Sequence, residues 1–262
     1  MAATGRIAVI TGGASGIGHA TARRFAGAGD CVVIADLNEA NAGEVVKEIV
    51  GAGGKAAAYR LDVADEAAVA RAAEAIEARH GPVSVLMNSA GLLQRPRPLE
   101  EMDDQEEARV MEVNYQGTYL CCRHFGMRMA GRGQGAIVNI ASTSGYMRLP
   151  MLAYGASKAA VISLTGALGV ELGRRGVRVN AIAPGPVLTP IQQRNIQAGL
   201  RDPSKMLAGT AMNRWVTMEE IADGAYFLCS DQASAITGTT LPIDCGLLSG
   251  IGWSMMGGIP RG

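Results

Sequence analysis

Cysteine is scarce in this sequence, and its few occurrences form no recognisable framework. The 262 residues include five cysteines, an odd number scattered along the chain. Secreted domains stabilised by disulfides carry even sets of cysteines, and zinc sites repeat them at short spacings. We therefore expect a reduced, intracellular protein with five free thiols. They are Cys31, Cys121, Cys122, Cys229 and Cys245.

An excess of either charge is also missing. Lysine plus arginine and aspartate plus glutamate each number 24, so the formal net charge is zero. Such a chain has no global field for nucleic acid or an anionic membrane surface. No apolar run reaches the roughly 20 residues that cross a bilayer, and residues 1–6 do not resemble a signal peptide. We expect a soluble, cytoplasmic protein without nucleic-acid or membrane partners. The histidines are too far apart for a metal site (His19, His80 and His124).

The sequence does contain a regular alternation of short β-branched runs and longer alanine-rich stretches. This alternation indicates crossover units, and strands that are apolar on both sides are buried from both faces of a sheet. It predicts one α/β domain over residues 1–262, with a doubly wound parallel sheet of seven strands and helices on both faces. The expected strands are 6–11, 31–36, 56–62, 83–89, 136–141, 178–183 and 240–243. The expected helices are 17–28, 40–50, 66–79, 104–129, 153–174 and 218–228.

Two segments interrupt this alternation. Residues 188–215 have weak periodicity and contain Gly199, Pro203 and Gly209. Irregular segments of this length in a compact domain are usually functional or partly disordered, so we interpret this one as a substrate lid. Residues 246–262 form an irregular C-terminal tail. Its large side chains either cover a neighbouring subunit's site or pack on their own subunit (Trp253, Met255 and Met256).

Glycines crowd the junction between the first strand and the first helix, where the sequence reads Thr11-Gly-Gly-Ala-Ser-Gly-Ile-Gly18. Glycines permit a tight turn and a close approach to a pyrophosphate, while a helix start offers unpaired N–H groups. A strand-to-helix turn without a ligand would use the same residues. Asp36 favours the dinucleotide, because it ends the second strand 24 residues after Gly12. Its carboxylate can accept hydrogen bonds from both ribose hydroxyls.

The same carboxylate would repel the 2′-phosphate of NADP. Ser15 and Leu37 occupy the neighbouring positions at which a base would attract that phosphate, and neither is basic. The predicted cofactor is therefore NAD. A helix-capping role is the alternative interpretation of Asp36.

The glycine turn resembles the TGxxxGIG turn of the short-chain dehydrogenase/reductase family, and further family motifs follow in order. Asp62-Val63 resembles the pair that holds the adenine ring, and Asn88-Ser-Ala-Gly91 resembles the NNAG motif. Pro184-Gly185 with Thr189 resembles the PGxxxT segment that contacts the nicotinamide carboxamide. The resemblance covers residues 6 to about 246 and implies a Rossmann fold. The cofactor residues expected are Gly12, Ser15, Gly16, Ile17, Gly18, Asp36, Leu37, Asp62, Val63, Asn88, Ala90, Gly91, Tyr154, Lys158, Pro184, Gly185, Val187 and Thr189.

Tyr154 and Lys158 stand four residues apart in a predicted helix, which places both side chains on one face. A tyrosine ordinarily keeps its proton at neutral pH, and a nearby cation would lower its pKa. The pair would then exchange a proton with an alcohol or an alkoxide near pH 7. The spacing alone is common on helices, and the upstream glycine turn is what favours a catalytic pair.

The resemblance implies two further catalytic residues. Ser142 resembles the family serine that stabilises the substrate oxygen, with Ser144 as a substitute. Asn114 resembles the family asparagine that holds a water for proton relay, and a satisfied amide in a kinked helix is its alternative. With Tyr154 and Lys158, these residues would transfer a hydride between a secondary alcohol and NAD.

The residues expected around the substrate are mostly apolar, which favours a hydrophobic or aromatic alcohol. They are Gln94, Ser144, Met147, Met151, Pro186, Met206 and Trp215. A sugar or polyol dehydrogenase of the same family is the alternative, followed by a non-enzymatic NAD-binding regulator. Family resemblance also implies a homotetramer, in which the small apolar run 161–170 faces a partner subunit.

Overall fold

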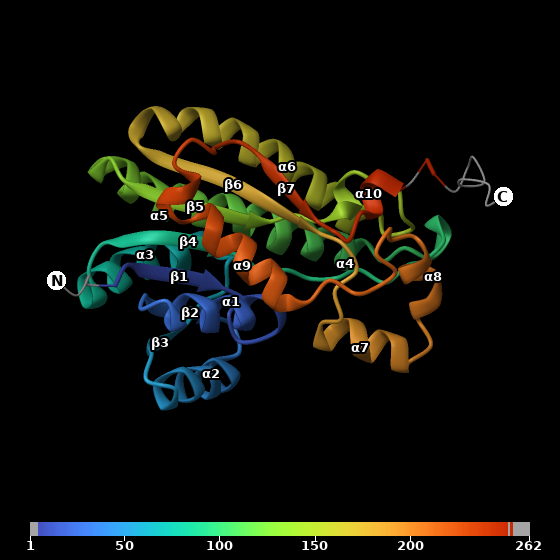
Figure 1. Cartoon of the computed structure of the whole chain (residues 1–262), viewed down its shortest axis with the longest axis horizontal. Helices are drawn as coiled ribbons and strands as arrows, with labels where there is room; N and C mark the ends of the chain where they lie inside the picture. Colours follow the sequence, from blue (N-terminus) through green and yellow to red (C-terminus); the bar gives the residue numbers. More distant parts are fainter. Residues whose placement is uncertain (1–4, 251, 254–262) are drawn as a thin grey trace.

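Seven short apolar segments pair into one parallel sheet (Figure 1). The computed structural model describes residues 5–250, 252 and 253, and the strand order is β3-β2-β1-β4-β5-β6-β7. The order reverses between β1 and β4, and ligands of such sheets bind at the carboxyl ends of the strands near that point. The strands are β1 (Ile7–Thr11), β2 (Cys31–Asp36), β3 (Lys55–Arg60), β4 (Val83–Asn88), β5 (Gly135–Ile140), β6 (Val177–Pro184) and β7 (Thr240–Ile243). The predicted fold class is confirmed.

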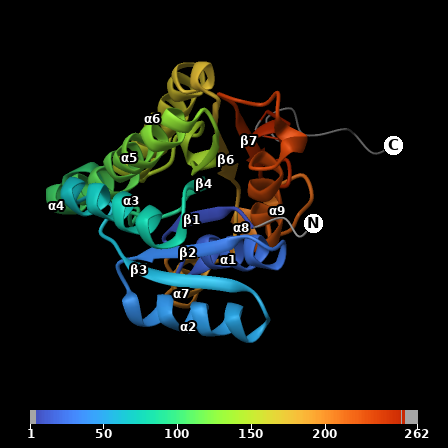
Figure 2. The same cartoon turned by 90° about the vertical axis from the view of Figure 1, so that its left-hand side faces the viewer.

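Helices cover both faces of the sheet (Figure 2). One face carries α1 (Gly16–Gly27), α2 (Glu39–Gly51) and α9 (Met218–Leu228), and the other carries α3 (Glu66–His80), α5 (Gly117–Arg132) and α6 (Leu152–Glu171). Neighbouring residues of β1 point to opposite faces, since Ile10 belongs to one buried cluster and Val9 to the other. Both side chains are fully buried, as the apolar character of both strand faces predicts.

The predicted helix 104–129 consists of three parts. They are α4 (Asp104–Met111), a π-helical turn (Glu112–Gln116) and α5, which continues to Arg132. Single π-turns of this kind occur frequently at functional sites. Here the turn contains Asn114.

The expectation that residues 188–215 are irregular is wrong, because they include α7 (Pro190–Gln197) and α8 (Pro203–Ala208). Each helix starts with proline, and the side chains of Thr189 and Asp202 cap them by accepting backbone N–H bonds. Such caps stabilise short helices that have little apolar periodicity. Residues 188–215, here called the lid, lie between Val187 and Val216, which form an isolated parallel bridge.

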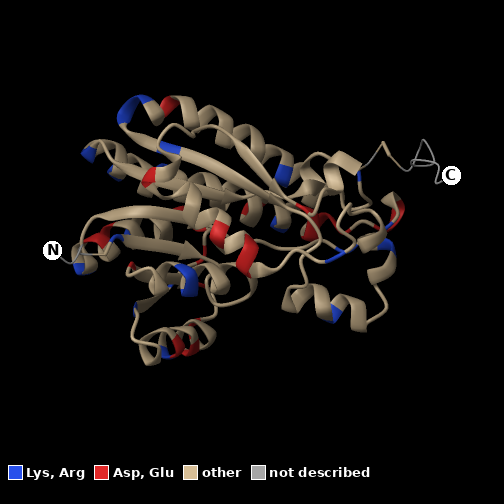
Figure 3. Ribbon diagram, viewed as in Figure 1, with Lys and Arg blue, Asp and Glu red and all other residues tan. Residues whose placement is uncertain are grey.

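The prediction of an irregular tail is wrong at its start, because residues Leu247–Gly250 form helix α10. Trp253 is 61% exposed. Met255 and Met256 lie outside the described residues, as does most of the predicted tail. Acidic and basic residues are interspersed along the ribbon (Figure 3). Within residues 5–250, 252 and 253, no helix is long and apolar enough to span a membrane. The same residues contain no group of three or more His, Cys, Asp or Glu placed to hold a metal ion.

Candidate active site

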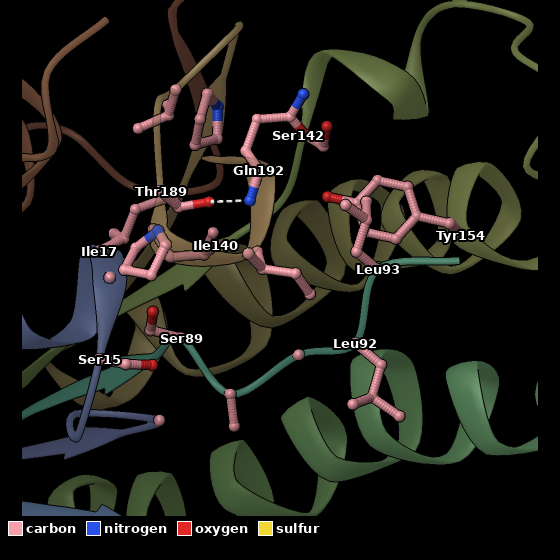
Figure 4. A pocket seen from close by; sticks show the side chains of 18 of the residues that line it. Ser15, Ile17, Ser89, Leu92, Leu93, Ile140, Ser142, Tyr154, Thr189 and Gln192 are labelled. Atoms are coloured by element: carbon pink, nitrogen blue, oxygen red, sulfur yellow. Dashed lines mark hydrogen bonds between the residues drawn. The ribbon is translucent and has the colours of Figure 1, made fainter. Parts of the chain in front are cut away.

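A cavity of about 1610 Å³ lies at the carboxyl ends of the strands. Its walls come from the segments that follow β1 to β6, together with helices α7 and α8. In Figure 4, Tyr154 reaches into this cavity from α6, whereas Thr189 and Gln192 enter from the lid. Leu92 and Leu93 follow β4 along its lower edge.

The glycine turn forms one end of the cavity. Gly12 has a φ of 66°, and a Cβ there would lie 2.7 Å from the backbone N and Cα of Ala90. A Cβ on Gly18 would collide with the carbonyl of Gly12. The turn therefore brings backbone against backbone, and the start of α1 keeps its N–H groups free of a side-chain cap from Ser15. This backbone cradle fits a pyrophosphate.

Asp36 stands beside this turn at the end of β2. Its Oδ2 accepts a hydrogen bond from the Ala14 N–H at 3.0 Å, and its Oδ1 accepts one from Asn38 at 2.9 Å. Each carboxylate oxygen has a further lone pair, so the group can still accept bonds from a diol. The cavity residues that follow it, Leu37 and Asn38, are neutral. The residues present therefore fit the adenosine ribose of a dinucleotide.

Asp62 lies at the end of the neighbouring strand, and Arg109 from α4 forms an ion pair with it at 3.0 Å. Burial alone would raise the pKa of Asp62, but the hydrogen bonds from Ala64 and Arg109 lower it. The carboxylate is therefore ionised and held in place near Val63, which also lines the cavity.

Asn114 lies fully buried behind the cavity wall. Its Oδ1 accepts a bond from the Leu92 N–H at 2.7 Å, and its Nδ2 donates to the Leu92 carbonyl at 3.0 Å and to Ser157 Oγ at 3.2 Å. A Cβ on Gly91 would lie 3.2 Å from Asn114 Oδ1 and 3.7 Å from Lys158 Nζ. A larger residue at this position would therefore crowd both the Asn114 amide and the Lys158 ammonium.

Lys158 is buried, and its ammonium donates to the Ile140 carbonyl at 2.8 Å. Burial lowers the pKa of Lys158 to about 8. Its Nζ lies 5.7 Å from the centre of the Tyr154 ring, so the helix spacing brings the two residues together as predicted.

The prediction that the pKa of Tyr154 lies below its ordinary value is wrong. Burial raises the pKa of this phenol, and the Ser142 hydroxyl and the Arg201 charge only oppose that rise. Spacing in a helix places a cation nearby but does not reveal how much water is excluded. The neutral phenol can donate a proton to a carbonyl, whereas the phenolate that accepts a proton from an alcohol forms more readily at higher pH.

Two serines follow β5 at the same cavity wall. Ser142 and Ser144 are both buried, and Ser142 Oγ accepts the Ser144 N–H at 3.1 Å. Of the two hydroxyls, that of Ser142 hydrogen-bonds to Tyr154 and lowers the pKa of the phenol. The geometry therefore favours Ser142 over Ser144 as the partner of the tyrosine.

Most of the residues predicted for the site come together at this one cavity. Those that line it are Gly12, Ser15, Gly16, Ile17, Asp36, Leu37, Asp62, Val63, Ala90, Gly91, Ser142, Ser144, Met147, Met151, Tyr154, Lys158, Pro184, Gly185, Pro186, Val187, Thr189 and Met206.

Five predicted residues are absent from that lining. Besides Gly18 and Asn114, they are Asn88, Gln94 and Trp215. Asn88 donates to Asn139 Oδ1 at 2.8 Å inside the sheet. Buried Gln94 accepts the backbone N–H of Tyr154 at 3.1 Å and donates to a Glu107 oxygen. It therefore connects the segment after β4 to the start of α6.

The sequence reasoning overlooked polar residues that the lid contributes. Gln192 and Arg201 both line the cavity, beside the exposed Arg194 and Lys205. The pairs Thr189-Pro190 and Asp202-Pro203 are helix-start signals and would have located both helices. Which of their residues face the cavity depends on how the two short helices pack, and the sequence does not show that.

Comparison with known proteins shows similarity along nearly the whole chain. A family model described as enoyl-(acyl carrier protein) reductase matches residues 12–248. The chain is 40% identical to D-threitol dehydrogenase of Mycolicibacterium smegmatis over 92% of each protein. It is 39% identical to cis-4-hydroxycyclohexanecarboxylate dehydrogenase of Sinomonas cyclohexanicum, over 92% of this chain and 96% of the relative.

Two solved structures show the same fold. One, described as ribose-5-phosphate isomerase from Brucella melitensis 16M, has a TM-score of 0.93 and 42% identity and covers 98% of each chain. The other is described as a putative NAD(P)-dependent gluconate 5-dehydrogenase from Beutenbergia cavernae with bound NADP at low occupancy. It has a TM-score of 0.87 and 38% identity, covering 94% of this chain and 98% of that one.

Proposed function

Since this chain belongs to the short-chain dehydrogenase/reductase family and is an oxidoreductase that acts on alcohols, we propose that it interconverts a secondary alcohol and its ketone with NAD(H). One observation carries the proposal. Tyr154, Ser142 and Lys158 share a single cavity with the glycine turn and Asp36.

The proposed roles follow from the position of each group. NAD, when bound, supplies the hydride acceptor, and the glycine turn, Asp36 and Lys158 would hold it. Tyr154 takes the hydroxyl proton as the alcohol is oxidised and returns a proton in reduction. Ser142 hydrogen-bonds the substrate oxygen and stabilises its developing negative charge.

Asn114 would act behind these groups. Its side-chain bonds to both backbone groups of Leu92 fix the wall next to Gly91. Gly91 lies close to both Asn114 and the Lys158 ammonium, and this shared neighbour supports a role of Asn114 in returning protons to solvent.

NAD rather than NADP is proposed on the basis of Asp36. Its carboxylate accepts two backbone N–H bonds, which hold a negative charge where the 2′-phosphate of NADP would lie. The Beutenbergia structure is described with NADP, so cofactor preference has to be measured on this chain.

Two substrate classes agree with the cavity. Met147, Met151 and Met206 favour a hydrophobic alcohol, whereas Gln192 and Arg201 favour one with further polar groups. D-threitol and cis-4-hydroxycyclohexanecarboxylate, named for the two relatives, both carry such groups, so a polar polyol or ring alcohol is the second candidate. Isomerisation is not proposed, because it would leave the dinucleotide turn and Asp36 without a role.

The test is the initial rate of NAD or NADP reduction with four alcohols. They are D-threitol, cis-4-hydroxycyclohexanecarboxylate, cyclohexanol and 1-phenylethanol. We expect turnover with NAD, loss of at least about 100-fold in kcat for Tyr154→Phe, and unchanged NAD binding in that variant. Faster turnover with NADP would refute the role of Asp36. Equal rates for wild type and Tyr154→Phe would refute the role of the tyrosine.

We also propose a cytoplasmic homotetramer. Ala167 and Val170, one turn apart at the end of the small apolar run on α6, are both exposed, and small apolar side chains in this arrangement can pack against a partner helix. Sedimentation equilibrium of the wild type beside Val170→Glu tests this assembly. A wild type that sediments as a monomer would refute it.

A further inference from the structure

Arg201 is an arginine without a carboxylate partner inside the cavity. It precedes α8 in the lid and is half-buried. Among the residues that the structure describes, its guanidinium donates a hydrogen bond to the Met151 sulfur alone, at 2.9 Å from Nη2. Within residues 5–250, 252 and 253, no aspartate or glutamate forms an ion pair with it. A thioether is a weak acceptor, whereas guanidinium has five N–H donors in a planar fork.

The neighbouring Asp202 does not neutralise the charge of Arg201. The Asp202 carboxylate accepts bonds from the Ser204 backbone and hydroxyl and lies 3.9 Å from Lys205. The Asp202 carboxylate therefore caps the N-terminus of α8.

Arg201 lies at the end of the cavity that contains Tyr154. Its charge acts on Tyr154, and Met151 comes immediately before the helix that carries the tyrosine. The acidic residues in the cavity lining are Asp36 and Asp62, which follow β2 and β3. Around Tyr154 the described lining thus contains cations without carboxylates, and burial lowers the pKa of Arg201. A partly desolvated cation of this kind is stabilised by an anionic ligand.

We propose that Arg201 binds a carboxylate of the substrate, so that the preferred substrates are hydroxy acids, oxidised to the corresponding keto acids. This inference rests on the proposed function. In the reaction the carbinol loses a hydride to NAD and its hydroxyl proton to Tyr154, while the carboxylate keeps its charge and its two bonds to Arg201. One planar guanidinium matches the two oxygens of a carboxylate. A phosphate ester would carry about two charges, whereas the other lid cations at the cavity, Arg194 and Lys205, are exposed to water.

Matched substrates separate charge from shape. The pairs are 3-hydroxybutanoate with 3-hydroxybutanamide, and 4-hydroxycyclohexanecarboxylate with its carboxamide. For the wild type we expect kcat/KM to be at least about tenfold higher for the acid, as one charge-assisted bidentate contact implies. Arg201→Met should remove this preference, lowering kcat/KM far more for the acid than for the amide and leaving the KM for NAD unchanged. Lys205→Met, a change in the same lid and at the same cavity, should keep it.

Four outcomes would overturn the inference. The first three are equal rates for acid and amide in the wild type, an equal loss for both in Arg201→Met, and loss of the preference in Lys205→Met. The second would mean that Arg201 acts only through Tyr154 or through lid structure. A raised KM for NAD in Arg201→Met would instead assign the guanidinium to the cofactor and also overturn it.

A binding measurement keeps this inference separate from the proposed function. Calorimetry with the NADH complex compares cyclohexanecarboxylate and cyclohexanecarboxamide, neither of which can react. Tighter binding of the carboxylate to wild type than to Arg201→Met supports the inference even if no alcohol turns over. If turnover requires Tyr154 but the rates for acid and amide are equal, the role proposed for Arg201 is refuted and the proposed function is not.

Discussion

Replacing Lys158 with methionine should stabilise the protein at neutral pH and abolish its dehydrogenase activity. The pKa of Lys158 falls from 10.5 to about 8 in the folded protein because the ammonium is buried. At 1.36 kcal/mol per pH unit, the burial of this charge costs about 3 kcal/mol at pH 7. The loss of its hydrogen bond to the Ile140 carbonyl removes about 1 kcal/mol. The variant should therefore gain about 2 kcal/mol.

The pH dependence identifies the cause. Between pH 8 and 10.5 the unfolded chain binds the proton and the folded chain does not, so wild-type stability rises through this window. The advantage of Lys158→Met should therefore shrink as the pH rises from 7 to 10. The assay is urea unfolding at fixed protein concentration without nucleotide.

Lys205→Met is the matched control, because its side chain is 86% exposed and the same replacement should change stability little. A Lys158→Met variant that is less stable than wild type at pH 7 would refute the reasoning. So would a stability difference that stays constant with pH.

Two further predictions concern the glycine turn and the serine. Gly12→Ala should lower NAD affinity by at least about tenfold and destabilise the protein by about 1–3 kcal/mol, because it combines a positive φ with a 2.7 Å contact to Ala90. The control is Gly27→Ala, where a Cβ would meet nothing within 4 Å. Nucleotide titration and thermal unfolding compare the two variants, and equal effects in both would contradict this prediction. Ser142→Ala should move the midpoint of the pH–kcat profile for oxidation to higher pH, because the Ser142 hydroxyl lowers the pKa of Tyr154. Ser144→Ala should leave the midpoint in place, and the reverse pattern would exchange the two roles.

The strands were predictable because buried parallel strands are continuously apolar. Residues 31–36 were expected to form a strand and form β2 with the same bounds. The spacing of Tyr154 and Lys158 likewise determined their common helix face, since that depends only on the helical period.

Features that depend on packing were not predictable in this way. The helices α7 and α8 have eight and six residues and are too short for a clear periodic pattern. The pKa direction of Tyr154 depends on surrounding elements that exclude water, and a local pattern contains no information about them. Arg201 was overlooked for the same reason, since its position follows from the lid fold.

The bridge between Val187 and Val216 has a consequence for how new specificities arise. Val216 also donates its N–H to the Pro186 carbonyl at 2.9 Å, so both ends of the lid meet beside the sheet. Insertions between such fixed ends are inexpensive, with each doubling of loop length costing about 0.6 kcal/mol. Exchange of this segment between homologous genes would therefore change the chemical groups around the substrate while the strands and the glycine turn remain as they are. Selection can therefore change the lid independently of the cofactor site. For directed evolution, chimeras are best joined at Val187 and Val216.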